Sequence, residues 1–481
     1  MRSAAVAFIL SIITGTILTP LARRFAHRIG ALDHALSSRK IHGRPIPRLG
    51  GLAIVLAFYA PLAGLLLFHA GVNEIFLAER DHVIGLFLGG VLIALLGIYD
   101  DLRGAGAARK FIVQFAVAGI MYWLGYRIDD IANPFGAPLH LGWASLPFTL
   151  FWIVGVINAM NLIDGLDGLA GGVALVAVLT TFLISLQRGH PLMVLFSSAL
   201  AGAILGFLFY NFNPATIFMG DTGSMFLGFV LATSAIQTNQ KSSTAVAVLI
   251  PGIALGLPIM DTLLAMGRRA LRGRPMFQAD KEHIHHRLLA RGLSHRQAVL
   301  VLYSFCILLG GVALVLTYAN SVQSAFVLVA LGIIAFVALR ALGFMRLDRM
   351  SETASERRKN KALRAAARPL GQRLRQVRTL DETWAILTEA GVVFGAVTVR
   401  VGPVPAFAHE FEQTEIGPDQ LFEARFVLPG STCTLELAWR DGRKEMDRDT
   451  EIAVDIFCEF LAEALTRVAS DGPSVARLPA S

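Results

Sequence analysis

Charged residues are scarce in this sequence. Only 16% of its 481 residues are Asp, Glu, Lys or Arg, whereas a soluble globular domain has about 25%. Hydrophobic residues make up 54% of the chain, and its mean hydropathy is +0.59. This balance excludes an ordinary soluble enzyme and places the chain in a membrane.

Cysteine is also scarce. The three cysteines, Cys306, Cys433 and Cys458, have neither the spacing of a metal site nor the even count of a disulfide framework. A disulfide-stabilised secreted domain and a cysteine zinc site are therefore excluded, and a reducing compartment for the C-terminal part is allowed.

The net charge of +8 is unevenly distributed along the chain. Residues 1–345 carry +10, residues 346–378 carry +8 and residues 379–481 carry −10. We interpret these parts as a transmembrane domain, a basic juxtamembrane linker helix and an acidic cytoplasmic domain. Because the basic excess lies in and next to the membrane part, it indicates topology and anionic lipid, and no nucleic-acid partner is expected.

Apolar runs of about 20 residues predict an all-α polytopic membrane protein with about 11 transmembrane helices. Arg23, Arg24 and Arg28 follow the first run, which indicates a retained helix and not a signal peptide. Alternate loops hold 18 Lys and Arg against 4 in the others, so the N-terminus is expected outside and the C-terminus in the cytoplasm. The runs are 3–21, 50–70, 82–99, 109–126, 144–162, 168–186, 192–211, 222–237, 243–267, 297–318 and 321–342.

The acidic C-terminal part predicts a small α+β domain. Residues 381–392 and 449–468 have helical patterns, and residues 396–401, 423–428 and 432–437 alternate as strands do. This order resembles sensory modules of the GAF type, although no ligand signature is present. A regulatory or partner-binding role with an unidentified partner or ligand is expected.

Acidic residues in the membrane part gather at the ends of the predicted spans. Six aspartates at these ends all map to the cytoplasmic side of the predicted topology, which was derived from the Lys and Arg residues alone. Clustered carboxylates imply a metal ion or a shared proton, and oxygen ligands suit Mg²⁺, or Mn²⁺ as a substitute, bound together with substrate phosphates. For any one of them a helix N-cap is the alternative. The six are Asp100, Asp101, Asp164, Asp167, Asp221 and Asp261.

A polar segment follows the fifth run. Asn158, Asn161 and Asp164 recur at three-residue steps, which places them on one helical face. Gly165 and Gly168 then allow the backbone to approach a ligand closely. A polar helix end with small-residue packing is the alternative interpretation, but it does not explain two Asn and two Asp in fifteen residues.

A histidine cluster lies in the long loop after the ninth run. Such a cluster can bind zinc, shuttle protons or bind phosphate. Without cysteine and beside Lys281, an anion site is favoured over zinc, with a solvated loop as the alternative. The cluster consists of His283, His285, His286 and Arg287.

In this order, these motifs resemble the polyprenyl-phosphate N-acetylhexosamine-1-phosphate transferase family (glycosyltransferase family 4), which includes the phospho-MurNAc-pentapeptide translocase. The resemblance covers residues 1–342 and leaves residues 346–481 outside it. It depends on Gly97-Ile-Tyr-Asp100-Asp101, Asn158-x-x-Asn161-x-x-Asp164-Gly-x-Asp167-Gly-Leu, Asn211-x-Asn213-Pro-Ala-x-Ile-Phe218-Met-Gly220-Asp221-Thr-Gly-Ser224, Pro258-Ile-Met-Asp261 and the histidine cluster.

The resemblance implies transfer of a sugar 1-phosphate from a UDP-sugar to a polyprenyl phosphate at the inner face of a bacterial cytoplasmic membrane, with release of UMP. The His-Ile-His-His-Arg form of the loop is that of the GlcNAc-1-phosphate branch, which initiates O-antigen and other cell-envelope glycans. UDP-GlcNAc is therefore the expected donor. A direct attack by the lipid phosphate is preferred over an aspartyl intermediate, although both are compatible with the sequence.

The resemblance also implies residue roles. The Asp100 and Asp101 pair acts on the lipid phosphate, and Asp221, with Asp164 as a second candidate, binds Mg²⁺. A basic residue often follows the pair, and both Arg103 and Lys110 are candidates for it. The expected catalytic residues are Asp100, Asp101, Asp164, Asp221, His285 and His286. The expected nucleotide and substrate contacts are Asn158, Asn161, Asp167, Asn211, Phe218, His283 and Arg287.

Two other functions fit parts of the sequence. An intramembrane aspartyl protease has Tyr-Asp and Gly-x-Gly-Asp pairs, but Phe218 replaces the first glycine here and the histidine cluster would be unexplained. A secondary transporter predicts charges at the membrane midplane and an internal repeat, and the sequence has neither. Whether the chain forms a homodimer is left open.

Overall fold

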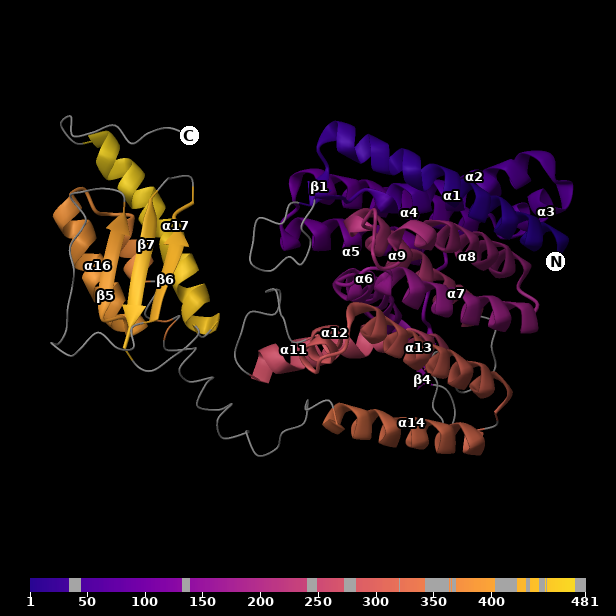
Figure 1. Cartoon of the computed structure of the whole chain (residues 1–481). Coiled ribbons are helices and arrows are strands. Elements are labelled where there is room, and N and C mark those ends of the chain that lie inside the picture. Colours follow the sequence, from indigo (N-terminus) through magenta and orange to yellow (C-terminus); the bar gives the residue numbers. More distant parts are fainter. Residues whose placement is uncertain are drawn as a thin grey trace. The chain divides into compact units, whose positions relative to one another are not determined.

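The structure is a computed structural model that divides the chain into two units, residues 1–267 with 279–345, and residues 346–481 with 268–278. Each unit is described by itself (Figure 1). The described residues are 1–33, 45–131, 139–239, 249–271, 283–319, 321–341, 363, 365, 369–402, 422–429, 433–440, 446 and 448–471.

The first unit is a bundle of helices with two short hairpins. The hairpins pair β1 (Leu32–Asp33) with β2 (Ile46–Pro47) and β3 (Asp130–Ile131) with β4 (Leu139–His140). The helices are α1 (Arg2–Ile29), α2 (Gly50–Phe68), α3 (Ala70–Ala78), α4 (Arg80–Arg103), α5 (Ala107–Trp123), α6 (Ser145–Ile163), α7 (Leu169–Gln187), α8 (Pro191–Asn211), α9 (Gly220–Asn239), α10 (Leu249–Ala254), α11 (Gly256–Leu271), α12 (Ile284–Ala290), α13 (His295–Tyr318) and α14 (Ser321–Ala341).

Each predicted apolar run overlaps helix within the described residues, but the expected count of 11 spans is not shown. Within the described ranges, eight helices are long and apolar enough to cross a membrane: α1, α2, α4, α6 with the preceding 3₁₀ turn, α7, α8, α13 and α14. The helix α5 has only 17 residues, and the continuous helix α9 contains several Gly, Ser and Thr residues, which lower its hydropathy. The structure therefore shows a mostly helical protein with eight candidate membrane spans.

The predicted run 243–267 differs most from the structure. Residues 243–248 lie outside the described ranges, and the remainder is divided at Leu255 into α10 and α11. In a continuous helix the ring of Pro258 would clash with the carbonyl of Ala254, four residues earlier. The proline therefore accounts for the break.

The N-terminus of α9 is tightly enclosed by two other helices. A Cβ on Gly97, in α4, would lie 2.3 Å from Thr222 Cα, and a Cβ on Gly51, in α2, would lie 2.0 Å from the backbone nitrogen of Gly223. Glycine at both positions lets the backbones touch. As a result, the end of α4 and the start of α2 hold the first turn of α9 in place.

In its described residues, the second unit has three strands and two long helices: α16 (Leu380–Phe394), β5 (Thr398–Gly402), β6 (Phe422–Val427), β7 (Thr434–Trp439) and α17 (Arg448–Asp471). The antiparallel sheet has the order β5-β7-β6, as Figure 1 shows. Its buried face includes Val399 and Leu437, which pack with both helices in one hydrophobic core. All five elements occur where the sequence pattern predicts them.

The basic stretch 346–378 lies largely outside the described residues. Its last part does not form a separate linker, because Leu370, Leu374 and Val377 are buried in the core of the second unit. The thiols of Cys306, Cys433 and Cys458 are all buried.

Candidate active site

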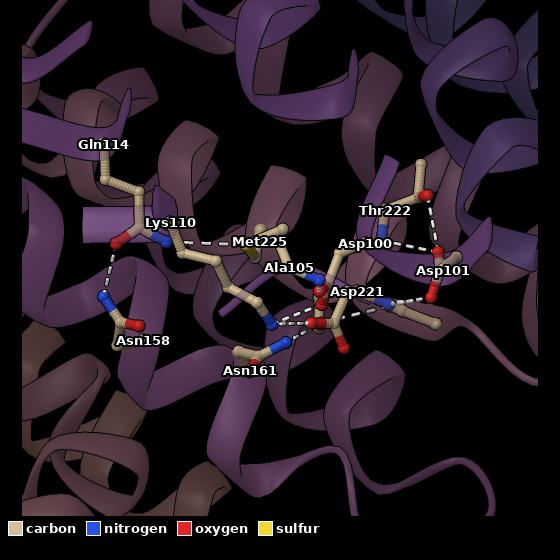
Figure 2. A network of polar contacts seen from close by, with 12 residues as sticks. Asp100, Asp101, Ala105, Lys110, Gln114, Asn158, Asn161, Asp221, Thr222 and Met225 are labelled. Atoms are coloured by element: carbon tan, nitrogen blue, oxygen red, sulfur yellow. Dashed lines mark hydrogen bonds and ion pairs between the residues drawn. The ribbon is translucent and has the colours of Figure 1, made fainter. Parts of the chain in front are cut away.

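Asp101 stabilises the N-terminus of α9 (Figure 2). Its Oδ1 accepts the Asp221 N–H at 2.9 Å, and its Oδ2 accepts the Thr222 N–H at 3.0 Å and the Thr222 hydroxyl at 2.6 Å. The first backbone N–H groups of a helix have no partner within the helix. Asp101 supplies that partner from a different helix, and both its carboxylate oxygens are thereby occupied.

Asp100 faces a different group of residues. The Lys110 ammonium forms ion pairs with both Asp100 and Asp221, and the Ala105 N–H donates to Asp100. The side chain of Lys110 is about one-fifth exposed, whereas Arg103 is exposed. Of the two basic candidates, the structure therefore places Lys110 between the carboxylates.

The two asparagines of α6 have different partners. The Asn161 amide donates to Ser224 Oγ at 3.0 Å and to the Asp221 carboxylate. The Asn158 amide donates instead to Gln114 Oε1 at 2.7 Å and to the Val154 carbonyl at 2.8 Å. Asn161 thus belongs to the carboxylate cluster, whereas Asn158 joins α6 to α5.

Gln114 was not identified from the sequence. It is fully buried, and its amide nitrogen lies 3.4 Å from Met225 Sδ. One signal was available, because Gln114 follows Lys110 by four residues and so lies on the same helical face within an apolar run.

The turn between α6 and α7 carries Asp164 and Asp167. Burial and the nearby charge of Asp221 raise the pKa of Asp164 to about 8. Asp167 accepts hydrogen bonds from Asn213 Nδ2 and from the Ala215 N–H, both at 3.0 Å. Asp167 therefore joins the turn to the segment that precedes α9.

Asn211 and Phe218 lie in the same region. Asn211 Oδ1 accepts the Gly168 N–H at 3.1 Å and its amide donates to the Ile217 carbonyl at 2.9 Å. The backbone of half-buried Phe218 pairs with Pro47 at 2.7 Å and Gly50 at 2.9 Å. In this structure both residues hold the segment before α9 against its neighbours.

The first residue of the histidine cluster, His283, contacts Asp261. This aspartate is buried and lies near the inner end of the ninth predicted run. His283 Nδ1 lies 2.9 Å from Asp261 Oδ2, and the Ile284 N–H donates to Asp261 Oδ1 at 2.9 Å. Asp261 and His283 are both buried. Asp261 therefore positions the start of α12, a role that was not assigned to it.

His285 faces the aspartate turn. It is 2% exposed, and a Cβ on Gly165 would lie 2.7 Å from its Nε2. Neither ring nitrogen has a hydrogen-bond partner among the residues that the structure describes. Burial and the adjacent His286 lower the pKa of His285 to about 3, so its ring is neutral near pH 7. His286 and Arg287 are half-buried.

The fit of the site to a metal ion depends on its oxygen donors. Across the described ranges, no group of three or more His, Cys, Asp or Glu side chains is arranged to hold a metal ion. Mg²⁺ usually binds through one or two carboxylates together with substrate phosphates. The carboxylates of Asp221 and Asp164 fit such a shared site, and a complete protein cage is not formed.

The part of the chain that carries these residues is similar to known proteins. The profile of a family described as glycosyl transferase family 4 matches residues 83–239. A probable undecaprenyl-phosphate N-acetylglucosaminyl 1-phosphate transferase of Bacillus subtilis is 41% identical over 67% of this chain and 87% of its own length. A decaprenyl-phosphate N-acetylglucosaminephosphotransferase of Mycobacterium tuberculosis is 33% identical over 60% of this chain and 78% of its own.

A more distant relative, the phospho-N-acetylmuramoyl-pentapeptide-transferase of Listeria welshimeri, is 31% identical over 62% of this chain and 92% of its own length. Each of these matches spans most of the relative, and the residues matched by the family profile include Asp100, Lys110, Asn161 and Asp221. The chain therefore belongs to glycosyl transferase family 4.

Proposed function

We propose that this protein transfers GlcNAc 1-phosphate from UDP-GlcNAc to a polyprenyl phosphate, such as undecaprenyl phosphate, and releases UMP. The observation that carries the proposal is the cluster of Asp100, Lys110, Asp221 and Asn161 on α4, α5, α9 and α6. The names of the Bacillus and Mycobacterium relatives support the same donor and acceptor. The positive-inside pattern supports a site at the cytoplasmic face, and the bacterial source of the relatives supports a bacterial inner membrane.

The reaction is a phosphoryl transfer. An oxygen of the lipid phosphate attacks the phosphorus that carries the sugar, and the bond from that phosphorus to the bridging oxygen breaks. UMP leaves with the electron pair of that bond. Such a reaction depends on in-line positioning and charge neutralisation more than on covalent chemistry, so we favour a single step.

Asp221, with Asp164 nearby, would hold Mg²⁺ or Mn²⁺ together with the diphosphate oxygens. When bound, the ion supplies positive charge next to the transferred phosphoryl group. Asn161 orients Asp221 through its amide. The ammonium of Lys110 balances part of the negative charge of the carboxylates.

Of the aspartate pair, we assign the role next to the lipid phosphate to Asp100, which acts through Lys110. Both oxygens of Asp101 bind the backbone or hydroxyl of α9, whereas Asp100 pairs with a lysine at the site. In this assignment Lys110 attracts the lipid phosphate and Asp100 orients the lysine.

The histidine cluster contributes to the sugar diphosphate side. Neutral His285 offers one donor and one acceptor nitrogen, and Arg287 supplies a fixed positive charge. We propose that His286 and Arg287 contact the diphosphate or sugar, with His283 held in place by Asp261. The preference for GlcNAc rests on the form of this loop and on the names of the relatives.

The aspartyl protease alternative is not favoured by the geometry. Its mechanism requires two carboxylates that share a proton, whereas Lys110 lies between Asp100 and Asp221. For the C-terminal unit we propose a regulatory or partner-binding role.

The transfer is tested with membranes that contain the protein, radiolabelled UDP-GlcNAc and undecaprenyl phosphate. We expect label to enter the organic-extractable fraction and UMP to appear in equal amount. UDP-GalNAc and other UDP-N-acetylhexosamines are compared as donors. No extractable label with any of these donors would rule the proposal out.

The role of Asp221 is tested by Asp221→Asn, which keeps the shape of the side chain and removes its charge. We expect loss of transfer at every Mg²⁺ concentration. The control is Asp130→Asn, an exposed carboxylate of the β3 strand, which should leave transfer unchanged. Full activity of Asp221→Asn would remove Asp221 from the metal site.

A further inference from the structure

A tyrosine outside every motif holds the turn between α6 and α7. The hydroxyl of Tyr303, in α13, donates to the Gly168 carbonyl at 2.5 Å. The same carbonyl accepts the Gly172 N–H at 2.9 Å, and the Gly168 N–H donates to Asn211 Oδ1 at 3.1 Å. Gly168, whose φ is +77°, is therefore fixed at both its backbone polar atoms.

The first turn of α7 is shaped to receive the tyrosine ring. A Cβ on Gly172 would lie 1.9 Å from Tyr303 Cζ and 2.0 Å from its hydroxyl oxygen. No flexible side-chain end is involved in this contact, since the ring is rigid. Only glycine at position 172 leaves room for the ring in this position.

A second contact from the same helix supports the turn. A Cβ on Gly168 would lie 3.1 Å from Phe212 Cδ2, and the Arg296 guanidinium lies 6.0 Å from the centre of the Phe212 ring. Arg296 and Tyr303 are two turns apart on α13. This helix therefore contacts the turn directly through Tyr303 and indirectly through Phe212.

The helix that carries Tyr303 follows the histidine helix in the chain. His285, in α12, contacts Gly165 on the turn, while Tyr303 contacts Gly168 three residues later. Asp164 directly precedes Gly165 and lies four residues before Gly168. The position of Asp164 relative to the histidines is consequently set by the two contacts together.

We propose that Tyr303 is a positioning residue, which holds the 164–168 turn against the histidine helix so that Asp164 and His285 contact the same substrate. The proposal rests on the proposed function. Removal of the hydroxyl would leave the Gly168 carbonyl bonded to Gly172, so no buried polar group is orphaned and stability should change little. Catalysis is more sensitive, because a shift of about 1 Å at a reacting centre can cost about 100-fold in rate.

The test compares Tyr303→Phe with Tyr318→Phe, which makes the same change at an exposed position of the same helix. For each variant kcat, KM for UDP-GlcNAc, Tm and hydrogen–deuterium exchange of the 164–172 segment are measured. For Tyr303→Phe we expect a fall in kcat of about tenfold, faster exchange in that segment and an unchanged Tm. Tyr318→Phe should match the wild type.

Three results would overturn the proposal: wild-type kcat in Tyr303→Phe, reduced kcat without faster exchange, or a fall in Tm that accounts for the lost activity. A double-mutant cycle adds an independent measurement. Gly172→Ala should lower kcat in the wild type, since its methyl displaces the ring, and should add little in a Tyr303→Ala background.

Failure of the proposed function has a different signature. If the wild-type protein transfers no label from any UDP-sugar, the proposed function fails, and the exchange data still report whether Tyr303 holds the turn. If the wild type is active and Tyr303→Phe is equally active, the proposal for Tyr303 alone fails.

Discussion

Lys110 shows how the chemistry of the site depends on a single side chain. Two carboxylates close together in a partly dry environment repel each other, and the Lys110 ammonium pairs with both Asp100 and Asp221. A paired buried charge is costly to leave without its partner. The lysine is therefore expected to matter both for binding the anionic lipid phosphate and for keeping the two aspartates in place.

Substitution Lys110→Met should lower transfer by at least about 100-fold, because it removes the cation and leaves two facing carboxylates. Lys110→Arg should retain part of the activity, since it keeps the charge but not the compact shape. Arg109→Met, at an exposed neighbouring position, is the control. Equal activity of Lys110→Met and Arg109→Met would contradict this assignment.

The neutral state of His285 predicts a pH dependence of stability. An unfolded histidine has a pKa of about 6.5, whereas the pKa of folded His285 is about 3. Unfolding therefore takes up a proton below pH 6.5, and stability falls as the pH drops. At pH 5.5 the contribution lost from this one residue is about 1 kcal/mol.

The measurement is Tm at pH 8 and pH 5.5 for the wild type and for His285→Gln. The variant should lose less Tm on acidification than the wild type. His69→Gln, at an exposed position, should behave as the wild type does. An identical decrease in wild type and His285→Gln would show that His285 is not buried as a neutral ring.

At the scale of elements, the site depends on the N-terminus of α9. This helix begins at Gly220, where Asp101 binds the first backbone N–H groups and Gly51 and Gly97 allow α2 and α4 to approach closely. Three helices, α2, α4 and α9, thus meet next to Asp221, the residue that we propose as the metal ligand. A change at any of these contacts should act on catalysis through the position of α9.

The neighbours Asp100 and Asp101 should therefore respond differently to substitution. Asp101→Ala removes a helix cap and should cost about 1–2 kcal/mol of stability, with a lower Tm and reduced transfer. Asp100→Asn should abolish transfer with little change in Tm. Tm and transfer rate are measured for both variants in the same detergent. The reverse pattern would exchange the two roles.

At the scale of the whole molecule, the chain has separate hydrophobic cores. The main core of the helical bundle and the core of the C-terminal unit share no residue in the described part of the chain. The buried residues Leu370, Leu374 and Val377 belong to the second core. A truncation that removes the second core completely and leaves the first core intact must therefore end before residue 370.

A chain that ends at residue 345 should retain transfer in vitro, because none of the proposed site residues lies beyond it. The kcat and KM of the truncated and full-length proteins are compared in detergent, with Tm as the measure of folding. Unchanged kinetics are expected. A folded truncation that lacks activity would make the C-terminal unit part of the catalytic machinery.

Much of the architecture was predictable because its signals are local. Apolar runs indicated the helices α1, α2, α4 to α9, α13 and α14, and alternation indicated β5, β6 and β7. The break between α10 and α11 was not predicted, and we attribute it to Pro258 within the run 243–267. Similarly, Lys110 remained one of two candidates and Gln114 was missed, since Asp221 and Asn158, their respective partners on other helices, lie more than forty residues away in the chain.

Composition and the order of the motifs were sufficient to indicate a membrane protein of this transferase family, because hydropathy and motif spacing are properties of the chain itself. Which carboxylate faces which partner was decided only by tertiary structure. Asp100 and Asp101 are adjacent in sequence, but the helical rotation between them directs one to Lys110 and the other to the N-terminus of α9. That division depends on how α4, α5 and α9 pack. Such packing joins residues that are far apart in the chain, so no local sequence pattern predicts it.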